Sequence, residues 1–225
     1  MKVSKRLNVR KVFRKTHDPI WQLQFGVIVI MVLQYFTAGS LLPYDKTVIL
    51  GFEAFLLVAL AVVTSDGYHR VSPFRRLLAL SLIAIVAIIN IFSLVFLVRA
   101  LLFYDISGID GHELLLNGFT IYITNIFMFA LWFWEMDGGG PDRRVALQRR
   151  RDFLFPQMIH REIDARGWLP GFFDYLYLST TNVTNFASAD TVPLSHRAKM
   201  LMMIQALVSV MTVVLVAARA IGILQ

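Results

Sequence analysis

Residues 172–199, FFDYLYLSTTNVTNFASADTVPLSHRAK, decide how the chain is expected to fold. The segment is rich in hydroxyl, amide and acidic side chains, yet it lies between long apolar runs. Irregular polar backbone at membrane depth persists only where it is buried in protein or lines water, because an unsatisfied amide group in hydrocarbon costs several kcal/mol. The pattern therefore predicts a short helix, then a polar loop, then a long apolar helix.

The first part of this segment has helical spacing, which predicts a helix over 172–184. The positions that recur every three or four residues are Phe173, Leu176, Tyr177, Thr180 and Thr184. Polar residues follow, with Ala187 and Ala189 between them, and such small residues let backbones approach one another. Pro193 prevents an unbroken helix into the last apolar run, and Ser195 is the expected N-cap of that run.

The composition places the chain in the all-α class, as a polytopic membrane helix bundle. Its 225 residues are 57% hydrophobic, with a mean hydropathy of +0.62. The sequence has no cysteine, which excludes disulfides and zinc–thiolate sites. The net charge of +7 is attributed to loops that face the cytoplasm, so no nucleic-acid partner is expected. We also expect no cofactor and no metal.

About 20 apolar residues are needed for each membrane crossing, which predicts five crossings. They are expected near residues 20–42, 47–64, 77–103, 114–134 and 200–221. The arm 1–18 and the second and fourth loops are basic, whereas the first and third loops are almost free of Lys and Arg. This alternation predicts a multi-pass protein of the cell membrane with a cytoplasmic N-terminus. Residues 172–190 then enter from the cytoplasmic side, and we expect them to return as a re-entrant, pore-helix-like segment; the alternative is that they cross outright.

Four regions follow from this topology: the basic cytoplasmic arm 1–18, a four-helix transmembrane region 19–134, a cytoplasmic Gly/Arg-rich loop 135–171 and the helix–loop–helix module 172–225. Three glycines and Pro141 end the fourth crossing, after an expected interfacial belt of Trp132, Phe133 and Trp134. The arginines that follow lack the spacing of a phosphate-binding P-loop. An interfacial piece is predicted instead, with Phe153, Phe155, Met158 and Ile159 facing lipid.

Polar residues inside the apolar runs are the remaining candidates. Glu53 in the second crossing is either a functional intramembrane acid or an acid close enough to one end to snorkel or to be protonated. Asn90 in the third crossing is expected to bond a neighbouring helix. Gln205, Ser209 and Thr212 form a polar stripe that either joins helices or faces water. Both alternatives stay open for Glu53 and for the stripe.

The run DYLYLSTTNVTNFASADTVPLSHRAKMLMMIQAL, residues 174–207, resembles the pore helix, filter and inner helix of potassium channels. It also resembles a group of uncharacterised bacterial membrane proteins that end in such a segment. Their fourth crossing closes on the motif W-x-W-E-x-D-x-G-G-P, here residues 132–141. Against the channel pattern T-T-V-G-Y-G-D, residues 184–190 form the non-standard filter TNFASAD, with alanine in place of both glycines and Ser188 in place of the tyrosine.

The resemblance implies an oligomeric, cation-channel-like pore protein in which four subunits line one pathway for monovalent cations such as K⁺ or Na⁺. The filter-like residues would be Thr184, Asn185, Phe186, Ala187, Ser188, Ala189 and Asp190. Backbone carbonyls and hydroxyls would form the constriction, and Asp190 would concentrate cations at its mouth. The alternative is a non-conducting membrane scaffold or accessory subunit with the same fold. A third hypothesis is a small-solute transporter that uses Glu53, and the absence of H-E-x-x-H and G-x-S-x-G motifs argues against an enzyme.

Overall fold

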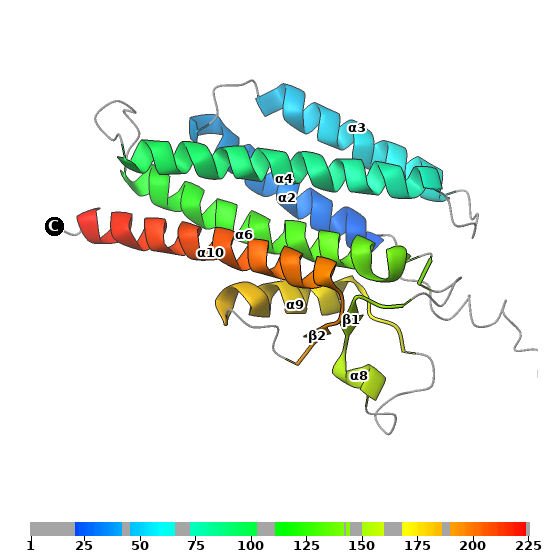
Figure 1. The fold of residues 1–225 in the computed structure, drawn as a ribbon. Coiled ribbons are helices and arrows are strands. Elements are labelled where there is room, and N and C mark those ends of the chain that lie inside the picture. The colour runs from blue at the N-terminus through cyan, green and yellow to red at the C-terminus, as the bar shows by residue number, and fades with distance from the viewer. Residues whose placement is uncertain are drawn as a thin grey trace, which may run out of the picture.

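The long apolar runs of the sequence fold into five long helices that run alternately up and down one bundle (Figure 1). They are α2 (Trp21–Leu41), α3 (Lys46–Ser65), α4 (Pro73–Leu102), α6 (Gly111–Met136) and α10 (His196–Ile223). The computed structural model describes residues 21–41, 46–65, 73–102, 111–141, 143–144, 150–159, 168–185 and 190–223. The expected all-α class is confirmed, and the expected arm 1–18 lies outside the described residues.

Within the described part of the chain, three helical segments are long and apolar enough to cross a membrane. They are Pro73–Ala100, His112–Gly139 and His196–Ala218. α2 and α3 contain the shorter apolar stretches Gln24–Phe36 and Leu50–Val62. A membrane protein is therefore supported by length and composition, whereas the number of five crossings stays a prediction.

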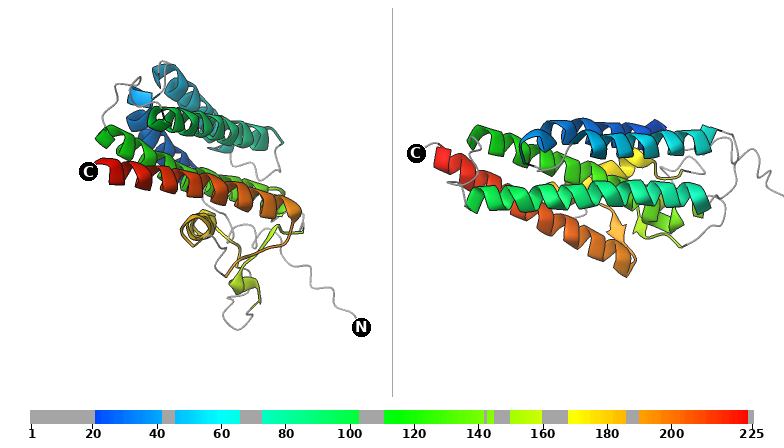
Figure 2. Two further views of the ribbon diagram at one scale, coloured as in Figure 1. Left: turned by 60° about the vertical axis from the view of Figure 1, so that its left-hand side comes forward. Right: turned by 90° about the horizontal axis from the view of Figure 1, so that it is seen from above.

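α6 is the central helix of the bundle, because it packs against α2, α4, α9 and α10 (Figure 2). Its side chains are buried on several sides, and Leu131, Phe133 and Trp134 are no more than 1% exposed. A helix with apolar residues on all its faces is suited to such a position, and its few buried polar groups bind neighbouring helices. α3 lies farther out and packs on α2 and α4.

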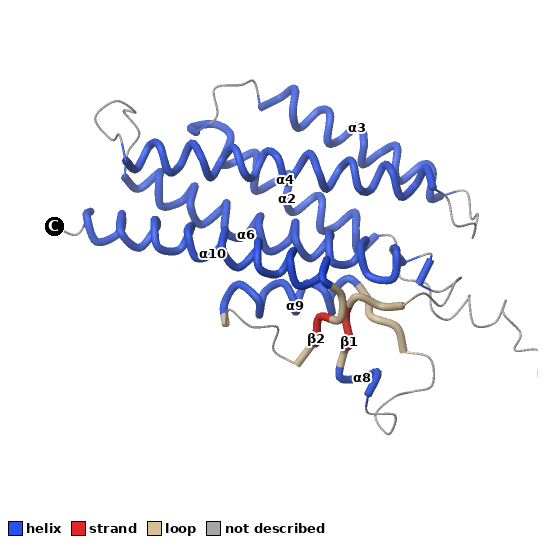
Figure 3. Tube along the Cα trace, in the orientation of Figure 1, coloured by secondary structure: helices blue, strands red, loops and turns tan. Residues whose placement is uncertain are grey.

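The shorter elements gather at the end of the bundle where α6 ends and α10 begins (Figure 3). They are the 3₁₀ turn η1 (Asp137–Gly139), strand β1 (Phe153–Leu154), helix α8 (Pro156–Ile159), helix α9 (Phe172–Thr184) and strand β2 (Val192–Pro193). β1 and β2 are antiparallel, with Phe153 opposite Pro193 and Leu154 opposite Val192. This pairing joins the segment after α6 to the segment before α10.

α9 begins at this same end and stops well short of the far ends of α6 and α10 (Figures 1 and 2). The predicted helix over 172–184 is confirmed, with the same bounds. The predicted N-cap is confirmed as well, since Ser195 Oγ accepts a hydrogen bond from the Ala198 N–H at 3.1 Å, and α10 starts at His196.

Two predictions about aromatic residues are wrong. Phe133 and Trp134 do not form an interfacial belt, because they are buried in the core that α6 shares with its neighbours. Phe153 and Phe155 do not face lipid either, since they are 0% and 3% exposed. Phe153 lies in β1, and its ring meets Phe133 at 5.3 Å between centroids. Phe155 follows the strand, and its ring meets Tyr175 at 5.3 Å. Ile159, at 55% exposed, is on the surface as predicted.

The contact between α6 and α10 depends on a glycine. A Cβ atom added to Gly118 would lie 2.3 Å from Val216 Cγ2, which is closer than atoms approach without a shift. We therefore expect Gly118→Ala to lower the thermal unfolding midpoint of the detergent-solubilised protein, and Val216→Ala in the same chain to restore it.

Gly51→Ala is the matched control, because a Cβ atom there meets nothing within 4 Å. Alanine is the better helix former by about 1 kcal/mol, so this variant is expected to unfold at the same or a higher temperature. An unchanged midpoint for Gly118→Ala would contradict the close packing of α6 on α10.

Candidate functional site: helix α9 and its surroundings

The start of α9 is held by hydrogen bonds on two sides. The Asp174 carboxylate accepts a hydrogen bond from the Gly171 N–H at 2.7 Å, which places an acid at the positive end of the helix dipole. The Phe172 N–H donates to Gln22 Oε1 of α2 at 3.2 Å. The Phe172 ring also fills the space beside Gly26, where an added Cβ atom would lie 3.0 Å from the ring.

One turn later, Tyr175 anchors α9 to the end of α6. Its side chain is fully buried, and its hydroxyl donates to Asp137 Oδ2 at 2.6 Å. Arg144 Nη1 donates to the same carboxylate oxygen at 3.3 Å and also to the Tyr175 hydroxyl. Burial raises the pKa of Tyr175 well above its usual range, against the opposing effect of Arg144. The phenol therefore stays protonated and remains a donor to Asp137.

The other oxygen of Asp137 binds the backbone of the β1 segment. Asp137 Oδ1 accepts from the Asp152 N–H at 2.6 Å and from the Phe153 N–H at 3.2 Å. In return, the Gly138 N–H donates to Asp152 Oδ2 at 3.1 Å. The Asp137 carboxylate thus receives hydrogen bonds from Tyr175, Arg144 and two backbone amides. We call this group of Asp137, Arg144, Asp152 and Tyr175 the Asp137 cluster.

The glycine triplet gives the chain the shape that this cluster requires. Gly138, Gly139 and Gly140 have φ values of 61°, 87° and 98°, a region that residues with a side chain rarely adopt. A Cβ atom on Gly138 would lie 2.6 Å from Arg144 Cγ. The run DGGGP therefore turns the chain sharply and leaves room for the Arg144 stem.

A second buried acid of the same motif binds a different helix. Glu135 is 0% exposed, and its Oε1 accepts a hydrogen bond from Arg75 Nη2 of α4 at 3.1 Å. Removing one partner of such a pair leaves an uncompensated buried charge, which is strongly destabilising. The sequence shows the motif at residues 132–141, but it does not show that Glu135 and Asp137 bind arginines, nor that Arg144 is one of these arginines. The visible signal was acids just before a glycine run, with arginines just after it.

The middle of α9 is joined to α6 and α10 by a chain of buried hydrogen bonds. Ser179 Oγ donates to the Ile126 carbonyl of α6 at 2.7 Å and accepts from Gln205 Nε2 at 2.6 Å. Asn182 Nδ2 donates to Gln205 Oε1 at 2.9 Å and to the Met202 carbonyl at 3.0 Å. These bonds fix the last turns of α9 against the second and third turns of α10.

The polar stripe of α10 continues this chain, which decides between its two possible roles. Asn125 Nδ2 of α6 donates to Ser209 Oγ at 2.8 Å. Gln205, Ser209 and Thr212 are 0%, 0% and 1% exposed. The stripe therefore joins helices within one chain, whereas the exposed side of α10 carries apolar residues such as Met203, Leu207 and Met211.

The filter-like residues come next in the chain, and those that the structure describes are exposed. Thr184 ends α9, and its hydroxyl donates to the Thr180 carbonyl at 2.9 Å. Asn185 caps the helix, and its N–H donates to the Thr181 carbonyl at 2.9 Å. Phe186, Ala187, Ser188 and Ala189 lie outside the described residues. Asp190 is exposed in the turn before β2.

Glu53 belongs to α3, which lies on the opposite side of the bundle from α9 (Figure 1). It is 0% exposed, so it does not snorkel to the surface. With the amide group of Gln34 oriented so that its nitrogen faces the acid, this nitrogen is 2.8 and 3.1 Å from the two carboxyl oxygens. Asn90 of α4 is likewise buried, at 4% exposed. The structure thus separates Glu53 from Thr184 and Asp190.

Comparison of the chain with known proteins found no related sequence or structure. The chain matches no known family, no curated protein and no solved structure. The resemblance of residues 174–207 to a pore helix, filter and inner helix therefore stays an expectation from sequence.

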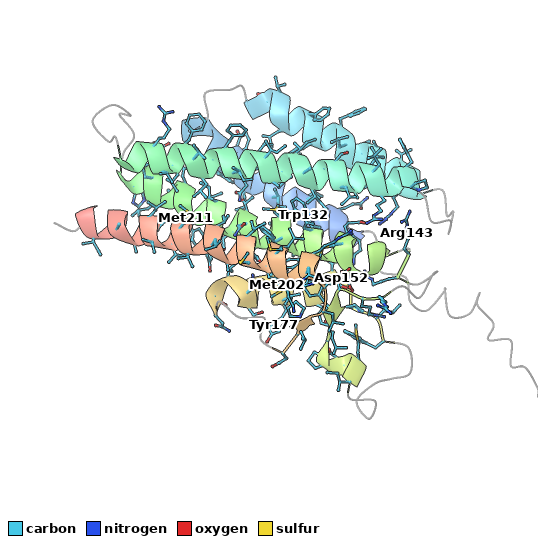
Figure 4. All side chains as sticks on the ribbon, in the orientation of Figure 1. Trp132, Arg143, Asp152, Tyr177, Met202 and Met211 are labelled. Carbon is cyan, nitrogen blue, oxygen red and sulfur yellow. The ribbon has the colours of Figure 1, made fainter. Side chains whose placement is uncertain are left out.

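Because only Tyr175 belongs to the Asp137 cluster, we expect Tyr→Phe substitutions at two nearby positions of α9 to change stability by different amounts. Tyr175→Phe removes a donor to a buried carboxylate, and we expect the free energy of unfolding to fall by about 1–3 kcal/mol. Tyr177 is 58% exposed on the outer side of α9 (Figure 4). For Tyr177→Phe we expect the free energy of unfolding to change by less than about 0.5 kcal/mol.

Denaturant unfolding of both variants in the same detergent measures this difference. Equal losses for the two variants would show that the Tyr175 hydroxyl contributes nothing specific.

Proposed function

We propose that the protein is an oligomeric, cation-channel-like pore protein of the cell membrane, in which α9 and the loop 185–190 form a re-entrant pore segment. The observation that supports this proposal is that α9 ends beside the middle of α10 rather than running its full length. Asn182 and Ser179 hydrogen-bond Gln205, which lies nine residues after His196 at the start of α10. Nine residues of helix span about 14 Å, roughly half of a hydrocarbon core of about 30 Å.

A helix that ends at this depth leaves polar groups where lipid cannot satisfy them. The last carbonyls of any helix lack intrahelical partners, and here Thr184 and Asn185 at the end of α9 are exposed. Such backbone is tolerated at membrane depth only where it meets protein or water. Several copies of the chain around a hydrated pathway would provide both.

The residues of the loop suit a monovalent cation such as K⁺ or Na⁺. Residues 184–189 would offer backbone carbonyls and hydroxyls, which replace the water around such an ion, and Asp190 would concentrate cations at the mouth. In this arrangement the N-terminus, the Asp137 cluster and the β1–β2 pair lie on the cytoplasmic side, as the basic loops predict. Four subunits are expected from the resemblance to potassium channels.

The second candidate is a non-conducting scaffold or accessory subunit with the same fold. The observation that favours it is the burial of Gln205, Ser209 and Thr212, because these polar groups bind helices of their own chain. The exposed face of α10 that is left to line a pathway is apolar. Ion flux decides between the two candidates.

The test is cation flux from liposomes that contain the purified protein. We expect Asp190→Asn to lower the flux by about threefold or more at 10 mM salt, because the acid attracts cations to the mouth. The effect should shrink at 1 M salt, where the Debye length falls from about 30 Å to about 3 Å.

Glu113→Gln is the control, since it removes an exposed acid at the start of α6, at the other end of the bundle. Its flux should equal that of the unchanged protein. If the folded, oligomeric protein carries no flux at all, the scaffold replaces the channel as the proposed function.

A further inference from the structure

Two glutamates of this protein are buried to the same degree but have different partners. Glu53 and Glu135 are both 0% exposed. Glu135 faces the guanidinium group of Arg75, with 3.1 Å between Oε1 and Nη2. Glu53 faces the amide group of Gln34, which carries no charge. One buried glutamate is therefore compensated by a positive charge, whereas the other is not, and the two can be compared in the same protein.

No positive charge in the described part of the chain compensates Glu53. α3 packs against α2 and α4, and the ionisable side chains of these two helices among the described residues are Tyr35, Arg75, Arg76 and Arg99. Arg75 is bound to Glu135, and Tyr35 and Arg99 are exposed. Arg75 and Arg76 lie in the first turn of α4. None of the three arginines forms an ion pair with Glu53. Gln34 is the polar partner of Glu53 in this part of the structure.

An ionised carboxylate in such surroundings is untenable. Transfer of an unpaired carboxylate into a low-dielectric medium costs so much that the group takes up a proton instead. Glu53 lies within the apolar stretch Leu50–Val62 of α3, and Gln34 lies within the apolar stretch Gln24–Phe36 of α2. A charged side chain among apolar residues of this kind is costly. One carboxyl group and one amide supply too few oxygens for a metal cation, which takes about six.

We propose that Glu53 is a proton-binding site within the helix bundle: at neutral pH it carries a proton and forms a neutral acid–amide pair with Gln34. A protonated carboxyl group donates through its O–H and accepts at its other oxygen, and a carboxamide can do the same. In the neutral pair the Gln34 N–H donates to the carbonyl oxygen of the acid, so this hydrogen bond joins the two side chains without any charge. This site is independent of the loop 185–190 and of conduction through it.

The measurement is difference infrared spectroscopy of the purified protein at pH 7, in the carbonyl-stretch region of protonated carboxyl groups. We expect a protonated carboxyl band that disappears in Glu53→Gln and persists in Glu135→Gln. Glutamine has the shape and neutrality of a protonated glutamate, so Glu53→Gln is expected to fold and to unfold within a few degrees of the unchanged protein. A band that persists in Glu53→Gln, or no band at all, would overturn the proposal.

A second measurement needs no variant. Hydrophobic carbodiimides react with protonated carboxyl groups in apolar surroundings. Mass spectrometry of the unchanged protein should therefore find at least tenfold more adduct on Glu53 than on Glu135. Equal labelling of the two glutamates would contradict a proton on Glu53.

Discussion

The arrangement of this protein depends on how one buried carboxylate, that of Asp137, is compensated. Asp137 lies directly after the last turn of α6. Its carboxylate accepts hydrogen bonds from a side chain of α9, from a side chain after the glycine turn and from two backbone N–H groups at β1. A buried charge is stable only when it is paired and fully hydrogen-bonded. Satisfying Asp137 therefore requires α6, α9 and β1 to meet at one place, which fixes the start of α9.

A second set of buried polar groups fixes the rest of α9. The Ser179 side chain hydrogen-bonds Ile126 of α6 and Gln205 of α10, and the Asn182 side chain hydrogen-bonds Met202 of α10. The helix is thus held at two levels, by a charged cluster at the end of the bundle and by neutral amides and hydroxyls deeper inside. Thr184 in its last turn and the C-cap residue Asn185 are exposed. Rigid placement of that last turn is what a pore-forming loop would need.

The bundle also separates its candidate sites. α9 packs on α6 and α10, whereas Glu53 lies at the contact between α2 and α3. The glutamate that faces an arginine, Glu135, belongs to the end of α6 and binds α4. Electrostatic compensation thus differs from site to site: ion pairs hold the end of the bundle, and a neutral acid–amide pair is proposed for the α2–α3 contact.

The sequence by itself determined the features that depend on local periodicity and on composition. These include the all-α class, the helix over 172–184 and the N-cap at Ser195, because helical spacing and capping chemistry act over a few residues. It identified Glu53 and the stripe of Gln205 and Ser209 as unusual, but it left their roles open. The location of Phe186–Ala189 stays a sequence expectation, since these residues lie outside the described part of the chain.

Only the tertiary structure decided which groups meet across the chain. Phe153 and Phe155 are buried because β1 pairs with a strand about 40 residues later and Phe155 packs on Tyr175 of α9. Neither partner can be read from their apolar pattern, which alone suggested lipid. Gln205 reaches Ser179 of another helix, and Tyr175 reaches Asp137, which is 38 residues away in the sequence. Periodicity gives the face of a helix on which a residue lies, but the partner of that face is set by packing. For this reason the sequence predicted the elements, and the fold decided the contacts of the candidate site.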